Sequence, residues 1–210
     1  MKKLIGTIVA VILLALLGVL GINIFKGMGP RERVKAEDGE RLVVEDLGWY
    51  SHGEKQCGKI WKPADENGCF PDSMGTRPVV IFFHDPMKSK EAGSLISRLV
   101  SQGVIGYTIA CPDKEKDIET IIRKMGKESF ADKDLIFIIA DTYAADATVK
   151  AILKVGSKTA GLILIGHELQ GKSAVTVRQH ASEILEIDKN QKSQALDLIT
   201  DYMEIRGAFK

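Results

Sequence analysis

Residues that could transfer protons or act as nucleophiles follow four short apolar runs of the sequence. Each run has the length and composition of a buried strand. The polar groups that follow the runs are His84-Asp85, Cys111-Pro112-Asp113, Asp141-Thr142-Tyr143 and His167-Glu168. Imidazole, carboxylate and hydroxyl groups can serve as general base, orienting acid and nucleophile. They can do so together only if the fold gathers the ends of these runs.

The apolar runs alternate with amphipathic segments, which predicts parallel strands joined by helices. Strands are expected at residues 79–83, 104–110, 135–140 and 160–165, and helices at 89–102, 118–125, 143–153 and 193–205. Short connections between them are typical of an open, mostly parallel sheet with helices on both faces. Residues 41–51 and 59–62 are expected to add antiparallel strands, and residues 174–187 could be strand or helix. The predicted fold class is α/β, with a ligand site at the carboxyl ends of the strands.

The N-terminal segment is predicted to be a transmembrane helix. No charged residue occurs between Lys3 and Lys26, and the apolar run from Leu4 to Ile22 extends to Phe25. Such a helix would span about 33 Å, compared with a hydrocarbon core of about 30 Å. The run is longer than that of a cleaved signal peptide, and no Ala-x-Ala site follows it. A cleaved signal and a buried helix are the alternatives.

The chain is therefore divided into an anchor at residues 1–25, a linker at 26–40 and one α/β domain at 41–210. Basic residues flank the apolar run on both sides, so their count does not decide the orientation. A short tail before a first apolar segment usually stays in the cytoplasm. We expect a single-pass membrane protein whose domain is extracytoplasmic.

Two cysteines are predicted to form a disulfide. Cys57 and Cys69 flank the turn-forming residues 65–68, and their bond would stabilise the fold by about 3 kcal/mol. Such bonds persist outside the cytosol. Two unpaired cysteines in a surface loop are the alternative.

Composition excludes some classes of partner. Formal net charge is +1, with 29 basic and 28 acidic residues, so no nucleic-acid partner is expected. The four histidines, His52, His84, His167 and His180, lack metal-ligand spacing. We predict no metal and no other cofactor, and residues 4–25 make the membrane the one partner indicated by the sequence.

Five segments have the order and spacing of a known enzyme core: GKIWKP (58–63), VVIFFHD (79–85), SRLVSQGVIGYTIACPD (97–113), DLIFIIADTYAADA (134–147) and AGLILIGHE (160–168). They resemble the dienelactone-hydrolase-like α/β-hydrolases over roughly residues 50–168. The resemblance implies that fold and, if the chain is active, esterase-type hydrolysis of a small-molecule ester. It also implies an oxyanion-loop region at His84, Asp85 and Tyr143, although the family has His-Gly where this chain has His84-Asp85.

The nucleophile position departs from the family pattern. The family has Gly-x-Ser-x-Gly, and this chain has Ala140-Asp141-Thr142-Tyr143-Ala144. The serine of that elbow has a strained backbone, which a β-branched residue such as threonine tolerates poorly. Either the turn has relaxed and catalysis is lost, or Thr142 is a divergent nucleophile. We expect a catalytically impaired protein, a pseudoenzyme.

If catalysis survives, the family order of nucleophile, acid and histidine is met by Thr142, Glu168 and His180. His180 would accept the hydroxyl proton, and Glu168 would orient its ring. Otherwise Glu168 is a solvated loop residue and His180 a surface histidine. The chain after Gly166 is short for the strands that normally carry the acid and the histidine, which argues against an intact triad.

Two non-hydrolytic functions stay open. The domain could bind a small ligand or a protein at the membrane, using the former cleft. A thioredoxin-like domain is the other alternative, but residues 84–88 after the first strand read HDPMK and lack the Cys-x-x-Cys pair that redox chemistry requires.

Overall fold

The computed structural model describes residues 25–26, 32–36, 39–51, 54–65, 67, 69–70, 75–110, 115–125, 127–155, 159–169, 176–177 and 183–209. For residues 25–26, 49–51 and 54–57 only the backbone is described. The predicted anchor, Leu4 to Phe25, lies outside these ranges except for Phe25. Within the described ranges, no helix is long and apolar enough to cross a membrane.

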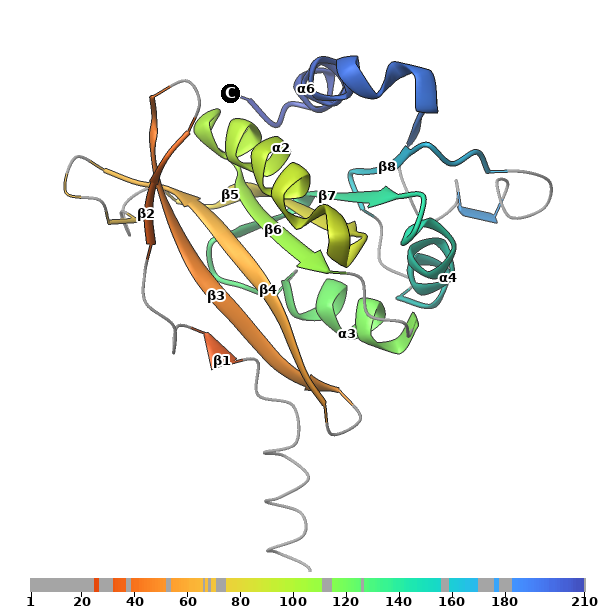
Figure 1. Cartoon of the computed structure of the whole chain (residues 1–210), viewed down its shortest axis with the longest axis horizontal. Coiled ribbons are helices and arrows are strands. Elements are labelled where there is room, and N and C mark those ends of the chain that lie inside the picture. Colours follow the sequence, from red (N-terminus) through yellow and green to blue (C-terminus); the bar gives the residue numbers. More distant parts are fainter. Residues whose placement is uncertain are drawn as a thin grey trace, which may run out of the picture.

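The described strands form one mixed sheet in the order β1-β3-β4-β6-β5-β7-β8-β9, with β2 paired to β3 (Figure 1). Their bounds are β1 Phe25–Lys26, β2 Glu32–Lys35, β3 Arg41–Ser51, β4 Glu54–Pro63, β5 Arg77–His84, β6 Ile105–Ala110, β7 Ala131–Asp141, β8 Gly161–Ile165 and β9 Ile184–Ile187. Strands β5 to β9 are parallel. The pairs β1–β3, β2–β3, β3–β4 and β4–β6 are antiparallel. The predicted open sheet is confirmed as a mixed sheet with a parallel half.

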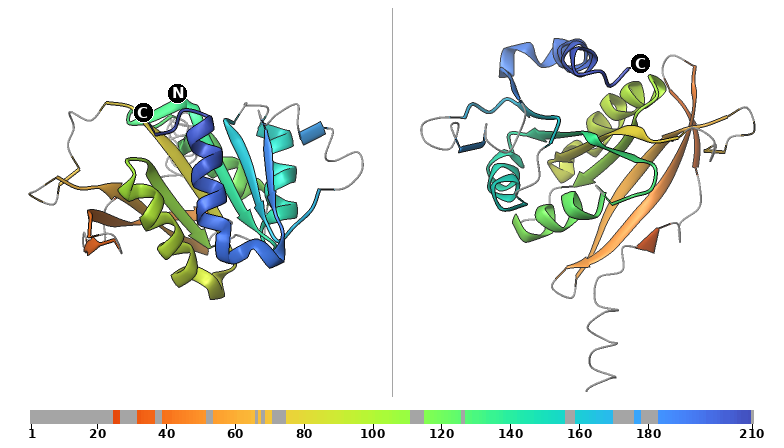
Figure 2. Two further views of the ribbon diagram at one scale, coloured as in Figure 1. Left: turned by 90° about the horizontal axis from the view of Figure 1, so that it is seen from above. Right: turned by 180° about the vertical axis from the view of Figure 1, so that it is seen from behind.

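Helices cover both faces of the sheet (Figure 2). One face packs against α2 (Ser89–Ser101) and α6 (Ala195–Ile205), and the other against α3 (Glu115–Met125) and α4 (Ala145–Val155). Two 3-10 helices, η3 (Pro86–Lys88) and η4 (Lys189–Gln194), directly precede α2 and α6. Alternate residues of a strand point to opposite faces, so Ile81 belongs to the core with α3 and α4, and Phe82 to the core with α2 and α6.

The strand order creates a switch point between β5 and β7. From β5 the chain passes through α2 to β6 on one side, and α3 then carries it back past β5 to β7 on the other. In such sheets ligands bind where the connections diverge, outside the carboxyl ends of the strands. His84 ends β5 and Asp141 ends β7, so two of the sequence-derived candidates lie at this point.

The C-terminal part is now assigned. Within residues 174–187, Ile184–Ile187 form β9, which pairs with β8. The predicted C-terminal helix is confirmed as α6, which begins at Ala195 and ends at Ile205. After β8, β9 is the one strand found in the described part of the chain.

The predicted disulfide between Cys57 and Cys69 is wrong, because Cys69 is a free, exposed cysteine. Strand β4 extends from Glu54 to Pro63 and so includes Cys57. The backbone from Cys57 to Pro63 is therefore extended over about 20 Å. Cys69 lies beyond that far end, where its carbonyl accepts a hydrogen bond from the Asp65 N–H. A disulfide requires Cα atoms within about 7 Å.

Part of the predicted linker, residues 26–40, belongs to the sheet. Strand β2 pairs antiparallel with β3 from Glu32↔Val44 to Lys35↔Arg41. Strand β1 pairs with β3 through Phe25↔Gly48 and Lys26↔Leu47. The sheet therefore begins earlier in the chain than residue 41.

Helix α2 lies close to β6 because Gly106 has no side chain. A Cβ at Gly106 would lie 2.9 Å from Val100 Cγ2 and would contact Ile96 Cγ2 more closely still. Both partners are buried residues of α2, so neither can move away without shifting the helix.

Replacement of Gly106 by Ala is expected to destabilise the fold by about 1–3 kcal/mol, the usual cost of overpacking a core. Chemical denaturation followed by circular dichroism would measure the change. Ser94→Ala, on the exposed side of α2, is the matched control and should change stability by less than about 0.5 kcal/mol. Equal stability of the two variants would contradict the close approach of α2.

Candidate functional site

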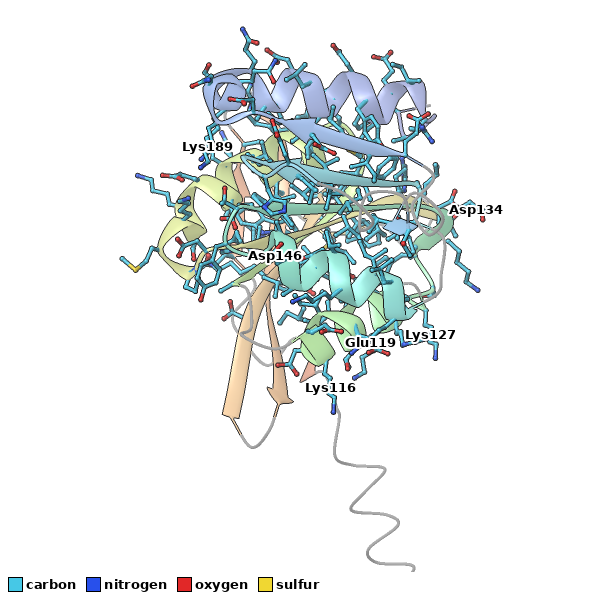
Figure 3. The ribbon with its side chains drawn as sticks, turned by 90° about the vertical axis from the view of Figure 1, so that its right-hand side faces the viewer. Lys116, Glu119, Lys127, Asp134, Asp146 and Lys189 are labelled. Atoms are coloured by element: carbon cyan, nitrogen blue, oxygen red, sulfur yellow. The ribbon has the colours of Figure 1, made fainter. Side chains whose placement is uncertain are left out.

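The structure gathers several candidate residues at the carboxyl edge of the parallel strands. Asp146, at the start of α4, and Lys189, at the start of η4, mark this edge in Figure 3, and Asp134 and Lys127 mark the opposite one. His84, Asp85, Thr142 and Tyr143 lie at the ends of β5 and β7, and His167 and Glu168 follow β8. Cys111-Pro112-Asp113 and His180 lie outside the described residues.

The carboxylate of Asp141 is the centre of this edge. It is 6% exposed, and its Oδ1 accepts hydrogen bonds from the Tyr143 N–H at 2.9 Å and the Ala144 N–H at 3.1 Å. Its Oδ2 accepts a third, at 2.9 Å, from the Asp85 N–H. The first two bonds are those of a helix N-cap, here at the start of α4. The third ties the loop after β5 to the turn after β7.

These hydrogen bonds occupy groups that the resemblance assigns to an oxyanion hole. In α/β-hydrolases the hole consists of the N–H after the nucleophile and an N–H from the loop after the strand that corresponds to β5. With Thr142 at the nucleophile position, these groups are the Tyr143 and Asp85 N–H. Both already donate to Asp141, so a carboxylate of the chain itself is the acceptor for these two N–H groups.

Thr142 is exposed, and its hydroxyl donates to backbone carbonyls. Oγ1 lies 3.2 Å from the Ile165 oxygen and 3.1 Å from the Gly166 oxygen. A Cβ on Gly166, whose φ is +73°, would lie 2.8 Å from the same Oγ1. The side chain thus connects the turn after β7 to the end of β8, and its proton is directed at carbonyls rather than at an imidazole.

The predicted triad is only partly within the described residues. Glu168 is exposed in the loop after β8. The neighbouring His167 lies 3.4 Å, Nε2 to Oδ1, from Asp146. His180 lies outside the described ranges. The described part of the chain therefore places no histidine against the Thr142 hydroxyl.

His84 is buried, with 2% of its surface exposed. Its Nδ1 lies 2.8 Å from the Asp85 carbonyl oxygen. Because a carbonyl can only accept, Nδ1 carries a proton, and in the neutral ring Nε2 is then an acceptor. Within the described residues Nε2 has no hydrogen-bond partner.

Two cavities meet His84, one on each side of α2. The smaller, of about 330 Å³, lies toward α6 and is lined by His84, Asp141, Lys88, Glu91 and Lys192, with apolar residues between them. The larger, of about 620 Å³, lies toward β4 and β6 and includes Trp61 and Thr108. We call them the α6-side cavity and the β4-side cavity. Both volumes are typical of small-molecule sites.

Sequence reasoning missed two features of this edge. Asp141 was taken as the variable residue of an elbow motif, although an aspartate just before a helix is also an N-cap signal. Lys192 was not considered, and its Cε lies 3.4 Å from the position of a Cβ on Gly166. The sequence spacing of Lys192 does not link it to Thr142. The two lie near each other because the fold places η4 at this edge of the sheet.

Comparison with known proteins supports the fold. No family model and no curated protein matches the sequence. Acetyl xylan esterase 1 from Thermoanaerobacterium sp. has a TM-score of 0.56 at 9% identity, and the match covers 88% of this chain and 87% of the esterase. A dienelactone hydrolase-like promiscuous phosphotriesterase from metagenomic libraries has a TM-score of 0.52 at 10% identity, covering 80% and 98%.

A cold-adapted esterase from an Arctic intertidal metagenomic library has a TM-score of 0.51 at 8% identity, covering 87% of this chain and all of the esterase. At such low sequence identities, these matches show that the fold is shared and do not show that the activity is. These matches favour the α/β-hydrolase fold over the thioredoxin-like alternative. The chain has the fold of the α/β-hydrolases, with dienelactone hydrolase-like proteins and acetyl xylan esterases among its structural neighbours.

Proposed function

We propose that this chain is a membrane-anchored α/β-hydrolase-like domain that does not hydrolyse esters and acts instead as a binding module. The observation that carries the proposal is the Asp141 carboxylate, which accepts hydrogen bonds from both the Asp85 and the Tyr143 N–H. Ester hydrolysis passes through a tetrahedral oxyanion, which those two groups would have to stabilise.

Charge makes this arrangement unfavourable for catalysis. One oxyanion-hole donor typically contributes about 3–4 kcal/mol to transition-state stability. A second negative charge about 4 Å from Asp141 would instead be opposed by about 4 kcal/mol at an effective dielectric constant of about 20. Thr142 would also have to give up its bonds to the Ile165 and Gly166 carbonyls. The occupied N–H groups and the charge of Asp141 are each large enough to suppress turnover severely, and the Thr142 bonds add a smaller cost.

Esterase-type hydrolysis is the second candidate. It is favoured by the structural neighbours, which include esterases and a phosphotriesterase. It would need Asp141 to leave the two N–H groups and a base to reach Thr142.

Membrane anchoring rests on the apolar sequence from Leu4 to Phe25 and on the charges that bound it. We propose that this segment holds the domain at the membrane surface on the extracytoplasmic side. A binding module in that place would meet ligands or partners without releasing a product.

The two residues of the former elbow should differ in their effect on stability. Asp141→Ala leaves the Asp85 and Tyr143 N–H groups without their acceptor, while the Ala144 N–H keeps the Asp141 carbonyl oxygen, and a loss of about 2–3 kcal/mol is expected. Thr142→Ala removes one bifurcated bond of an exposed hydroxyl to the backbone carbonyls of Ile165 and Gly166 and should cost less than about 1 kcal/mol. Chemical denaturation would compare them, with Asp141→Asn, which keeps an acceptor oxygen, falling between. Equal losses for Asp141→Ala and Thr142→Ala would remove the proposed role of Asp141.

A fluorophosphonate probe tests the nucleophile without knowledge of a substrate. The full chain, treated beside an active serine esterase, is expected to remain unlabelled, and p-nitrophenyl butyrate should be hydrolysed at the background rate. Thr142→Ala should behave as the unmodified chain. Labelling of Thr142, or saturable hydrolysis that disappears in Thr142→Ala, would establish the esterase alternative and end the proposal of a non-hydrolytic domain.

Cys69 provides a test of the membrane arrangement because its side chain is free and exposed. In a chain carrying Cys57→Ala and Cys111→Ala, a membrane-impermeant maleimide is expected to label Cys69 in intact cells. The same chain with Cys69→Ala is the control. The full chain should resist alkaline carbonate extraction, and a chain beginning at Gly27 should be released. Labelling only after permeabilisation would reverse the orientation, and release of the full chain would remove the anchor.

A further inference from the structure

The β4-side cavity is separate from the hydrolytic position. It lies between α2 and the strands β4 and β6, reaches β2, and has a volume of about 620 Å³. Neither Asp141 nor Thr142 lines it. A ligand could therefore occupy this cavity whether or not the oxyanion position is filled.

An indole ring forms its apolar wall. Trp61 lies against α2 where Gly93 leaves room, since a Cβ there would be 3.2 Å from Cζ2 and 3.3 Å from Cη2 of the ring. The indole N–H donates to Thr108 Oγ1 at 3.0 Å. The polar atom of Trp61 is thus satisfied inside the protein, and the ring offers a flat apolar surface that favours an aromatic ligand.

Two serine hydroxyls of the lining are also used internally. Ser97 donates to the Ser94 carbonyl at 2.9 Å and Ser89 to the Pro86 carbonyl at 2.8 Å. The cavity therefore offers few hydrogen bonds to the body of a ligand. One acceptor that the lining does offer is His84, which is buried and has Nε2 without a partner among the described residues. As an acceptor, Nε2 could receive a hydrogen bond from a hydroxyl group of a ligand.

Charge at the rim calls for an anion. Lys35, Lys59 and Lys90 line the cavity, against the single carboxylate of Asp46. Lys59 is paired with Glu32 at 3.7 Å. Lys35 and Lys90 are exposed and have no ion-pair partner within the described part of the chain. They are free to contact a carboxylate.

We propose that the β4-side cavity binds a small aromatic carboxylate that carries a hydroxyl group. Its ring packs on Trp61, its hydroxyl donates to His84 Nε2, and its carboxylate lies between Lys35 and Lys90. The proposal names a ligand class for the binding role proposed above and rests on that role, but it concerns a different cavity. Binding and ester hydrolysis are measured separately, so either proposal can fail alone.

The probe is 3-(4-hydroxyphenyl)propionate, added to the full chain in a non-ionic detergent. The chain has two tryptophans, so Trp49→Phe leaves Trp61 as the fluorescent reporter. We expect a saturable change in Trp61 emission, and calorimetry on the unmodified chain should give the same Kd. No saturable binding by either method would overturn the proposal.

Two analogues of the probe each lack one group. 3-Phenylpropionate lacks the hydroxyl and 3-(4-hydroxyphenyl)propan-1-ol lacks the carboxylate, and each should bind the unmodified chain about three- to tenfold more weakly. The His84→Phe variant should bind the probe and 3-phenylpropionate with equal Kd values, because the partner of the hydroxyl is gone. Equal Kd values for the probe and the alcohol, or for the probe and 3-phenylpropionate, would overturn the corresponding contact and with it the proposed class.

The lysines have a matched control. Lys35→Gln combined with Lys90→Gln should raise the Kd of the probe about three- to tenfold and leave that of the alcohol unchanged. Lys116→Gln with Lys133→Gln removes the same charge elsewhere, and Lys116 lies on α3 at the opposite face of the sheet (Figure 3). Equal effects of the two pairs would show a long-range charge effect and overturn the placement of the carboxylate.

Discussion

In the described part of the chain, the hydrogen bonds to the buried Asp141 carboxylate come from backbone N–H groups. Three N–H groups from two loops donate to its oxygens, and the N-terminus of α4 adds a favourable dipole. Because an unpaired buried carboxylate is very unfavourable, neither loop can move away without exposing that charge. The strands β5 and β7 are held together by their own pairing, and the two loops that follow them are linked by this one side chain.

Helix α2 divides the space beside this fixed point. It lies close to β6 at Gly106, where a side chain would contact Ile96 and Val100, and it leaves a cavity on each side. His84 contacts both cavities, so the end of β5 is shared between them. The α6-side cavity includes Asp141 and several charged residues, whereas the β4-side cavity is lined by an indole ring and lysines. The two cavities that meet at His84 therefore differ in the chemistry of their linings.

Much of the fold could be predicted because its core elements have clear periodicity. The runs of β5, β7 and β8 are apolar throughout and the helices amphipathic, so both the alternation and the carboxyl-edge candidates followed. Strands β1 and β2 were missed because they are short edge strands, and the sequence ERVK of β2 has no apolar pattern. The disulfide was wrong because loop spacing was judged without knowing that β4 includes Cys57.

The candidate site was less predictable than the fold. Sequence identifies Asp141 as an acid near a turn, but its role depends on the Asp85 N–H, 56 residues earlier in the chain. The cavities depend on small residues of α2 such as Gly93 and on where α2 lies over the sheet. These are long-range packing relations, and a single sequence contains no signal for them.

The pairing of β1 with β3 sets a geometric limit on how the domain could sit at a membrane. The first paired residue is Phe25, which is also the last residue of the proposed anchor, and only Asn23 and Ile24 separate it from Ile22, where the uninterrupted part of the apolar run ends. Three peptide links span at most about 11 Å. On the proposed topology this connection is therefore too short to let the domain rotate freely relative to the membrane. The edge of the sheet near Leu47 and Gly48 would stay next to the lipid head groups, and partners could approach only from the remaining sides.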